Sequence, residues 1–225
     1  MTAGRTIVFS KAAGAVGQRS MMLLQHNTGE HLMSDDPSTG WEAIATTFAT
    51  IRSDAGADIV RRWATSLRPA ATVLDIGCGT GLPIAKALAD DGFEVYGIDP
   101  SPTLLTAFRR HIAGAQALCE AAEQSRFFDR RFDGVVAVGV MFLLPEDSQR
   151  IVIERVGQAL YPGGHFLFSA PLQSCEWFDS LTGRRSVSLG EERYTQLLTS
   201  AGFRLAGTCF DEGSNNYFHA VLTSA

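Results

Sequence analysis

The segment Val73-Leu74-Asp75-Ile76-Gly77-Cys78-Gly79-Thr80-Gly81 gives the first indication of the fold of this chain. Its first four residues are mostly apolar and predict a buried strand, and the glycines that follow predict a loop leading into a helix. In parallel sheets, ligands bind beyond the carboxyl ends of the strands, where glycines let the backbone approach closely. The dinucleotide pattern G-x-G-x-x-G requires glycine where Leu82 stands, which disfavours a pyrophosphate loop. The segment therefore predicts a ligand-contacting loop of another kind.

Apolar strands alternate with amphipathic helices on both sides of this segment. We expect strands at 72–76, 94–98, 115–119, 133–138 and 165–169, and helices at 82–89, 102–111 and 145–160. A turn at 161–164 precedes the last of these strands. After a helix at 191–201, strands at 203–210 and 217–222 are joined by a short polar link and predict an antiparallel hairpin. The expected fold is α/β, a doubly wound, mostly parallel seven-stranded sheet with a reversed last strand and helices on both faces.

Acidic residues stand at the ends of the next two strands. Asp99 follows the second strand, where a carboxylate can accept hydrogen bonds from both hydroxyls of a ribose. Glu120 follows the third strand, where it can accept a hydrogen bond from the amino group of an adenine. Asp99 is therefore the first candidate for a ligand-binding side chain.

These motifs resemble, in their order along the chain, those of class I S-adenosylmethionine-dependent methyltransferases, which have a Rossmann-like fold. The resemblance covers residues 67 to 171 and is carried by Val73–Gly81, Gly97–Pro100, Cys119–Glu123, Phe132–Val138 and Leu160–Gly164. The closing helix and hairpin are similar to the family's reversed seventh strand. The resemblance implies a methyltransferase that uses S-adenosylmethionine as cofactor and releases S-adenosylhomocysteine.

The same resemblance assigns a cofactor site. It implies that the glycine loop holds the methionine and ribose parts, Asp99 the ribose hydroxyls, and Glu120 with Ala121 the adenine. Glu120 departs from the family pattern, in which Asp is common at this position. The positions implied for the cofactor are Asp75, Gly77, Cys78, Gly79, Asp99, Pro100, Glu120, Ala121 and Gly139.

Methyl transfer from a sulfonium requires mainly that the acceptor is aligned and water excluded, so a dedicated base is optional. No catalytic residue is assigned; the candidates are Met141, Tyr217 and His219, of which His219 is more typical of a structural residue in a sheet. Core packing explains the aromatic residues among the acceptor candidates equally well. The candidates for the acceptor site are Trp41, Phe48, Phe142, Trp177, Asn215 and Asn216.

Composition excludes several other classes of protein. The net charge of −5 and the scattered arginine pairs disfavour nucleic acid. The sequence Gly139-Val140-Met141-Phe142 also lacks the (Asn/Asp)-Pro-Pro-(Tyr/Phe) motif of amino-methylating nucleic-acid enzymes. Four widely spaced cysteines predict neither a metal site nor a disulfide framework, and no apolar run reaches the ~20 residues of a membrane span. We expect a cytoplasmic protein with a small-molecule substrate and no membrane partner.

One domain is expected at 41–225, after a loosely ordered leader at 1–40. The segments 41–66 and 172–190 are too short to be substrate domains, so we expect them to cover the substrate site. Methyl transfer to a small molecule is the leading function. The alternatives are intramolecular displacement within S-adenosylmethionine, giving a cyclic amino acid and methylthioadenosine, and a non-catalytic binding module. The acceptor, the methylated atom and the oligomeric state, including a homodimer, stay open.

Overall fold

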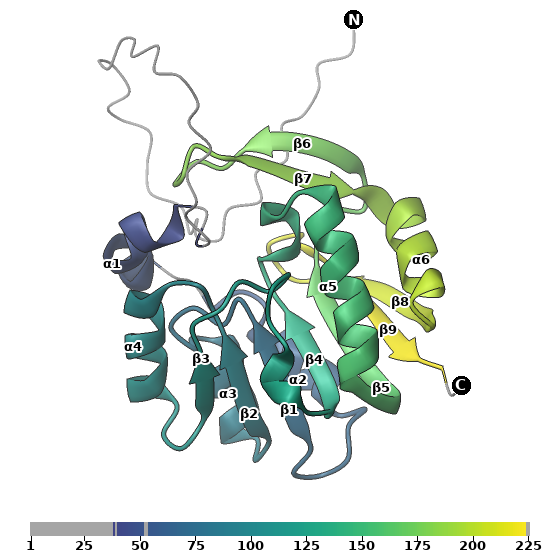
Figure 1. Ribbon diagram of the computed structural model, residues 1–225, viewed down its shortest axis with the longest axis horizontal. Helices are drawn as coiled ribbons and strands as arrows, with labels where there is room; N and C mark the ends of the chain where they lie inside the picture. The colour runs from purple at the N-terminus through teal and green to yellow at the C-terminus, as the bar shows by residue number, and fades with distance from the viewer. Residues whose placement is uncertain (1–37, 39, 52–53, 224–225) are drawn as a thin grey trace, which may run out of the picture.

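Seven strands form the main sheet, in the order β3-β2-β1-β4-β5-β9-β8 (Figure 1). Strands β1 to β5 are parallel, and β9 runs antiparallel to both of its neighbours. The predicted doubly wound sheet with a reversed last strand is therefore confirmed. The bounds are β1 Thr72–Ile76, β2 Glu94–Ile98, β3 Gln116–Leu118, β4 Phe132–Ala137, β5 Leu160–Ser169, β8 Phe203–Phe210 and β9 Asn216–Leu222.

The computed structural model describes residues 38, 40–51 and 54–223. The leader predicted at 1–40 lies outside these residues, apart from Ser38 and Gly40. Among the described residues, none of the helices has the length and apolar character needed to cross a membrane.

Helices cover both faces of the sheet (Figure 1). On one face, α5 and α6 pack on a core that includes Phe166 and Phe168 of β5. On the other face, α2, α3 and α4 pack on a second core that includes Val73 and Leu167. The helices are α1 Trp41–Ile51, α2 Ala57–Ala64, α3 Ile84–Asp90, α4 Pro102–His111, α5 Glu146–Ala159 and α6 Gly190–Ser200, with short 3-10 helices η1 Phe127–Asp129 and η2 Met141–Leu143.

Local chemistry explains how these elements begin and pack. All five residues of β1 are buried, as expected for a parallel strand covered on both faces. The α4 helix begins after Ser101, whose Oγ accepts a hydrogen bond from Leu104 N at 3.1 Å. Gly134 lets α2 approach β4, because a Cβ at this position would lie 2.7 Å from Cη2 of Trp63. These contacts fix helices against the strands whose ends form the candidate site.

The insertion at 172–190 forms a second, two-stranded antiparallel sheet, β6 Ser174–Phe178 and β7 Arg185–Leu189. In Figure 1 this hairpin lies beyond the carboxyl ends of the main strands, above α5. Its tip reaches α1, because Leu181 packs against the cluster that contains Trp41 and Phe48. Two segments far apart in the sequence therefore meet at the same end of the sheet.

The turn expected at 161–164 is wrong as a boundary, because β5 already begins at Leu160. The register with β4 jumps from Phe132 opposite Leu160 to Gly134 opposite His165. The intervening residues form a wide bulge whose tight backbone needs glycine: a Cβ on Gly164 would lie 2.8 Å from Tyr161 O. The other boundaries differ from the expected ones by at most two residues, and β1, β2, α4 and β8 match them.

Candidate functional site

The glycine loop leaves β1 where the strand order reverses. The chain passes from β1 to β2 on one side and returns to β4 on the other, which creates the crevice where such sheets bind ligands. Gly77 and Gly79 have φ angles of +66° and +56°, values that other residues rarely adopt. A Cβ on Gly77 would also lie 2.8 Å from Cγ2 of Val140. The loop therefore presents bare backbone to the crevice.

Asp99 connects the end of β2 to this loop. Its side chain is buried, its Oδ2 accepts a hydrogen bond from Gly79 N at 2.9 Å, and its Oδ1 accepts one from Ser101 N at 2.9 Å. Carboxylate oxygens have two acceptor sites each, so Asp99 can brace the loop and still accept hydrogen bonds from a ligand. Asp75 is buried in β1 and lies in register with Gly97 of β2.

Cys78 belongs to the same loop, but its side chain points away from the crevice. A Cβ on Gly97 would lie 2.7 Å from Cys78 Sγ, and Cys78 is part of the core on the α2 and α3 face. Its backbone N donates to Ile98 O at 3.0 Å. The contribution of Cys78 to a ligand site is therefore limited to its backbone.

A narrow pocket lies beside the loop, with a cavity volume of about 40 Å³. Ligand sites usually span about 300 to 1,000 Å³, so its walls must move apart to admit a nucleoside. Its charged lining residues are three carboxylates, Asp99, Glu120 and Glu123. The pocket is lined by Ser38, Trp41, Gly77, Ile98, Asp99, Pro100, Leu104, Glu120, Ala121, Ala122, Glu123, Val140, Leu143 and Leu144.

Sequence reasoning missed Glu123 as a lining residue. Its Oε2 is buried and has no hydrogen-bond partner in the described part of the chain. A buried acceptor left without a donor is costly, so a ligand donor at this point would stabilise the site. The sequence did contain a sign of this role, because Glu123 lies three residues after Glu120 in the segment that follows the third strand.

A roof over the pocket is formed by α1 and the tip of the hairpin, residues 179–184. Trp41 lines the pocket and meets Phe48 edge to face, with ring centroids 5.1 Å apart. Both pack with Leu104 of α4, and Leu181 of the tip packs on the same cluster. A Cβ on Gly79 would lie 3.8 Å from Cε1 of Phe48, which places this ring next to the glycine loop.

Polar contacts of Glu42 hold the roof on α4. Its carboxylate accepts hydrogen bonds from Thr103 Oγ1 at 2.6 Å, from Thr103 N at 3.3 Å, and from Ser101 Oγ. Ser101 also stands two residues after Asp99, whose Oδ1 accepts from its backbone N. One short segment therefore holds both the roof and the carboxylate of the pocket.

The residues after β4 lie between the pocket and the hairpin. Gly139 N donates to Ser169 Oγ at 2.7 Å, which joins the ends of β4 and β5. Phe142 contacts Trp177 of β6, with ring centroids 5.4 Å apart. Met141 is completely buried in the core on the α5 side, so its sulfur faces packing atoms.

The C-terminal turn uses most of its polar groups internally. Asn215 donates to Asp211 from both its backbone N and its Nδ2, and Tyr217 OH donates to Asp211 Oδ2 at 3.0 Å. Asn216 is buried and its Nδ2 donates to Ala170 O at 3.1 Å, whereas its Oδ1 has no partner among the described residues. Asn216 thus keeps one free acceptor near the carboxyl end of β5.

His219 lies away from the pocket, opposite Leu167 in the middle of β9. Its Nε2 is 2.8 Å from Nδ1 of His165, and the two rings are stacked. Burial, followed by the charges of His165 and Arg204, lowers the pKa of His219 to about 4. Burial also lowers the pKa of His165. A neutral histidine pair in the sheet is the result.

The structure thus gathers some of the predicted residues and separates others. Gly77, Asp99, Pro100, Glu120, Ala121 and Trp41 line one pocket, and Phe48 and Gly79 lie beside it. Tyr217 and His219 are not lining residues. In the described ranges, no cluster of three or more His, Cys, Asp or Glu side chains is able to hold a metal ion.

Comparison with known proteins gives a consistent result. The family model described as "Methyltransferase domain" matches residues 48–216. Cypemycin N-terminal methyltransferase from a Streptomyces species is 33% identical over 204 residues, which cover 84% of this chain and 82% of that protein. A ubiquinone biosynthesis O-methyltransferase from Alkalilimnicola ehrlichii is 33% identical over 104 residues, 43% of this chain and 40% of that protein. The match therefore spans less than half the length of the second relative.

Solved structures share the fold at low identity. A 1,6-didemethyltoxoflavin-N1-methyltransferase from Burkholderia thailandensis aligns with a TM-score of 0.68 and 18% identity, covering 90% of this chain and 94% of that chain. The glycopeptide N-methyltransferase MtfA, complexed with S-adenosylhomocysteine, aligns with a TM-score of 0.62 and 22% identity, covering 76% and 90%.

Proposed function

Because the chain belongs to the methyltransferase domain family, whose cofactor is S-adenosylmethionine, we propose that it transfers the methyl group to a nitrogen atom of a small molecule. When bound, S-adenosylmethionine supplies a methyl group that is already activated by the positive sulfur. The observation that carries the proposal is the acidic pocket at the reversal of strand order, with Asp99 tied to the glycine loop.

The residues of the pocket fit this cofactor. A Cβ would fill the space at Gly77, so bare backbone is available for close approach. We assign the ribose hydroxyls to Asp99, the adenine to the segment from Glu120 to Glu123, and the methionine part to Gly77 and Gly79. The buried free oxygen Oε2 of Glu123 supports this assignment, because an adenine amino group offers the donor that it lacks. Three carboxylates also favour a positively charged ligand over an anionic one.

Nitrogen as the methylated atom is supported by two arguments. A relative that matches 84% of this chain is an N-terminal methyltransferase, and two structural neighbours are N-methyltransferases. In addition, the titratable groups that line the described pocket are carboxylates only. A neutral amine attacks through its own lone pair and loses its proton afterwards, so it needs no strong base.

The roof contributes the exclusion of water. Trp41 of α1 lines the pocket, Phe48 lies next to the glycine loop, and Phe142 packs on Trp177 of the hairpin. We propose that these rings enclose the acceptor and that, within segments 41–66 and 172–190, α1 and the hairpin tip cover the substrate site of one domain, whereas α2 packs on the sheet. Removing water strengthens the alignment of acceptor and methyl group and suppresses hydrolysis.

The test combines binding with product analysis. The full chain is titrated calorimetrically with S-adenosylhomocysteine and then incubated with ¹³C-methyl-labelled S-adenosylmethionine and a panel of small amines and phenols. Methylated amine and S-adenosylhomocysteine in equal amounts are the expected products. Methylthioadenosine formed without any acceptor would instead establish displacement within the cofactor. Binding of S-adenosylhomocysteine without turnover of the whole panel would contradict the small-amine acceptor.

Two further expectations stay predictions. A homodimer is tested by sedimentation of the full chain at several concentrations, and a cytoplasmic location by fractionation of the producing cells.

A further inference from the structure

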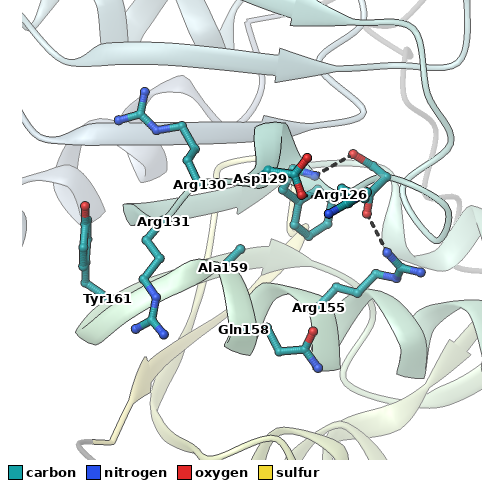
Figure 2. A pocket seen from close by; sticks show the side chains of 10 residues that line it. Arg126, Asp129, Arg130, Arg131, Arg155, Gln158, Ala159 and Tyr161 are labelled. Carbon is teal, nitrogen blue, oxygen red and sulfur yellow. Dashed lines mark hydrogen bonds and ion pairs between the residues drawn. The ribbon is translucent and has the colours of Figure 1, made fainter.

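A basic cavity lies at the opposite end of the sheet from the methyl-transfer pocket. Its volume is about 540 Å³, and four arginines line it against a single aspartate, Asp129 (Figure 2). The formal excess of three positive charges contrasts with the net charge of −5 of the chain. The cavity is lined by Ser125, Arg126, Phe127, Asp129, Arg130, Arg131, Arg155, Gln158, Ala159 and Tyr161.

The arginines of the cavity differ in how far they are already neutralised. Arg126 pairs with Asp129 at 2.7 Å, and Arg130 lies over the ring of Tyr96, 3.9 Å from Glu94. Within the described residues, Arg155 donates only to a neutral carbonyl, Ser125 O, at 2.7 Å. Arg131 makes no hydrogen bond or ion pair to any described residue. Two guanidinium groups, those of Arg131 and Arg155, therefore keep their charge available for a ligand.

The surrounding surface completes a site of molecular size. Figure 2 shows Arg131 beside Tyr161 on one side and Arg155 with Gln158 on the other, whereas Arg130 points away from them. Tyr161 is 46% exposed, which leaves its ring and hydroxyl accessible. Arginines, a glutamine amide and a tyrosine hydroxyl are all hydrogen-bond donors, and guanidinium groups bind phosphate oxygens in pairs.

From this arrangement we infer that the cavity binds a compact polyphosphate anion, with Arg131 and Arg155 as its main ligands. The site is separate from methyl transfer. Arg131 immediately precedes β4, and the other end of that strand, Ala137, leads to Gly139 near the pocket. At a rise of about 3.3 Å per residue, the strand separates the two sites by roughly 17 Å.

The backbone supports a built site of this kind. Phe127, Phe128 and Asp129 all have positive φ angles, between 49° and 61°, which is unusual for residues other than glycine. This strained turn places Arg126 at one end and Arg130 with Arg131 at the other, so all three line the same cavity. Strain of this type occurs preferentially at ligand sites.

Tripolyphosphate is the probe for a calorimetric titration of the full chain, because it contains no adenine that would enter the methyl-transfer pocket. The test variant is Arg131→Gln with Arg155→Gln, and the matched control is Arg62→Gln with Arg110→Gln, which removes equal charge from α2 and α4. Losing two charge-assisted contacts should weaken binding by at least about tenfold, while the control stays within about twofold of the wild type. Circular dichroism establishes that both variants are folded.

Several results would overturn the inference. These are a wild-type chain that does not bind tripolyphosphate at about 0.15 M salt, equal losses in the test and control variants, or binding of single-stranded RNA or anionic vesicles without binding of tripolyphosphate. None of these results depends on methyl transfer, so the cavity and the proposed reaction succeed or fail separately.

Discussion

The floor and the roof of the pocket beside the glycine loop are held together in different ways. The floor is the glycine loop between β1 and Asp99, and backbone hydrogen bonds to a buried carboxylate fix it within the sheet. The roof rests on side-chain contacts from two distant segments, with Glu42 and Trp41 as its main anchors. The floor is therefore expected to be rigid, whereas the roof can open to admit the cofactor through the narrow pocket.

Breaking the floor at Asp99 should have the largest effect. Asp99→Ala leaves the N–H groups of Gly79 and Ser101 without their acceptor. We expect a loss of about 2 to 4 kcal/mol in the free energy of unfolding and about 1 to 3 kcal/mol in S-adenosylhomocysteine affinity. Urea unfolding and calorimetry measure the two quantities. Asp99→Asn, which keeps one acceptor oxygen, is the control, and unchanged affinity in Asp99→Ala would refute the ribose assignment.

A crowded glycine offers the second way to break the floor. Gly77→Ala adds a Cβ 2.8 Å from Val140 at a φ of +66° and should cost about 2 kcal/mol of stability. Combining it with Val140→Gly removes both close contacts, those to Cγ2 and to Cβ of Val140, but not the strained φ. Thermal unfolding should therefore show partial recovery in the double variant relative to the sum of the single changes. If the stability losses of the two single variants add up fully in the double variant, positions 77 and 140 are not in steric contact.

The third prediction concerns the pH dependence of stability caused by His165 and His219. These residues lie in β5 and β9, strands that contribute no residue to the pocket lining. The pKa of His219 is about 4 in the folded chain and ordinarily about 6.5, so between these values only the unfolded state gains the proton. Stability should therefore fall as the pH drops from about 6.5 to 4, by about 1 to 2 kcal/mol after allowance for solvent screening.

His165→Gln with His219→Gln is the variant that checks this dependence. Its unfolding free energy should change less over that pH range, while its methyl-transfer rate at pH 8 stays within about twofold of the wild type. A rate that collapses in a folded variant would instead give the histidine pair a role in the reaction and contradict its placement away from the pocket.

Loosening the roof should have the smallest effect on stability. Glu42→Gln weakens the hydrogen bonds to Ser101 and Thr103, the first part-buried and the second exposed, at a cost of about 0.5 to 1 kcal/mol. Faster amide hydrogen exchange in α1, with unchanged exchange in β1, is the expected signature. Equal acceleration in both elements would show that floor and roof open as one unit.

Local sequence predicted the floor well because its determinants are adjacent in the chain. The strand, the glycines and Asp99 are each set by a few neighbouring residues, and the structure brings Gly77 and Asp99 to one pocket. The roof was predicted as two segments that cover the substrate site, but not the contact between them, because the contact of Leu181 with α1 depends on a fold across 140 residues. The alternation of Cys175 with Trp177 and of Val187 with Leu189 was nonetheless a strand signal.

The pattern of apolar and polar residues in the sequence could not predict the surroundings of individual side chains. The free oxygen of Glu123 depends on the course of the chain between β3 and η1, and the neutrality of His219 depends on a partner in another strand. Three of the four arginines of the basic cavity lie close together in the sequence, at positions 126, 130 and 131, and the packing of η1 against α5 adds Arg155. The net charge of the whole chain therefore gave no sign of this local cluster.

The reversal of β9 has a practical consequence for handling the protein. Because β9 starts near the pocket and runs antiparallel to β5, its last residue, Leu222, lies at the end of the sheet remote from the roof (Figure 1). A fluorophore or surface linkage attached beyond Leu222 would leave α1 and the hairpin unobstructed. The same label placed just before Trp41 would sit at the entrance and report on its opening, which offers a route to a ligand sensor.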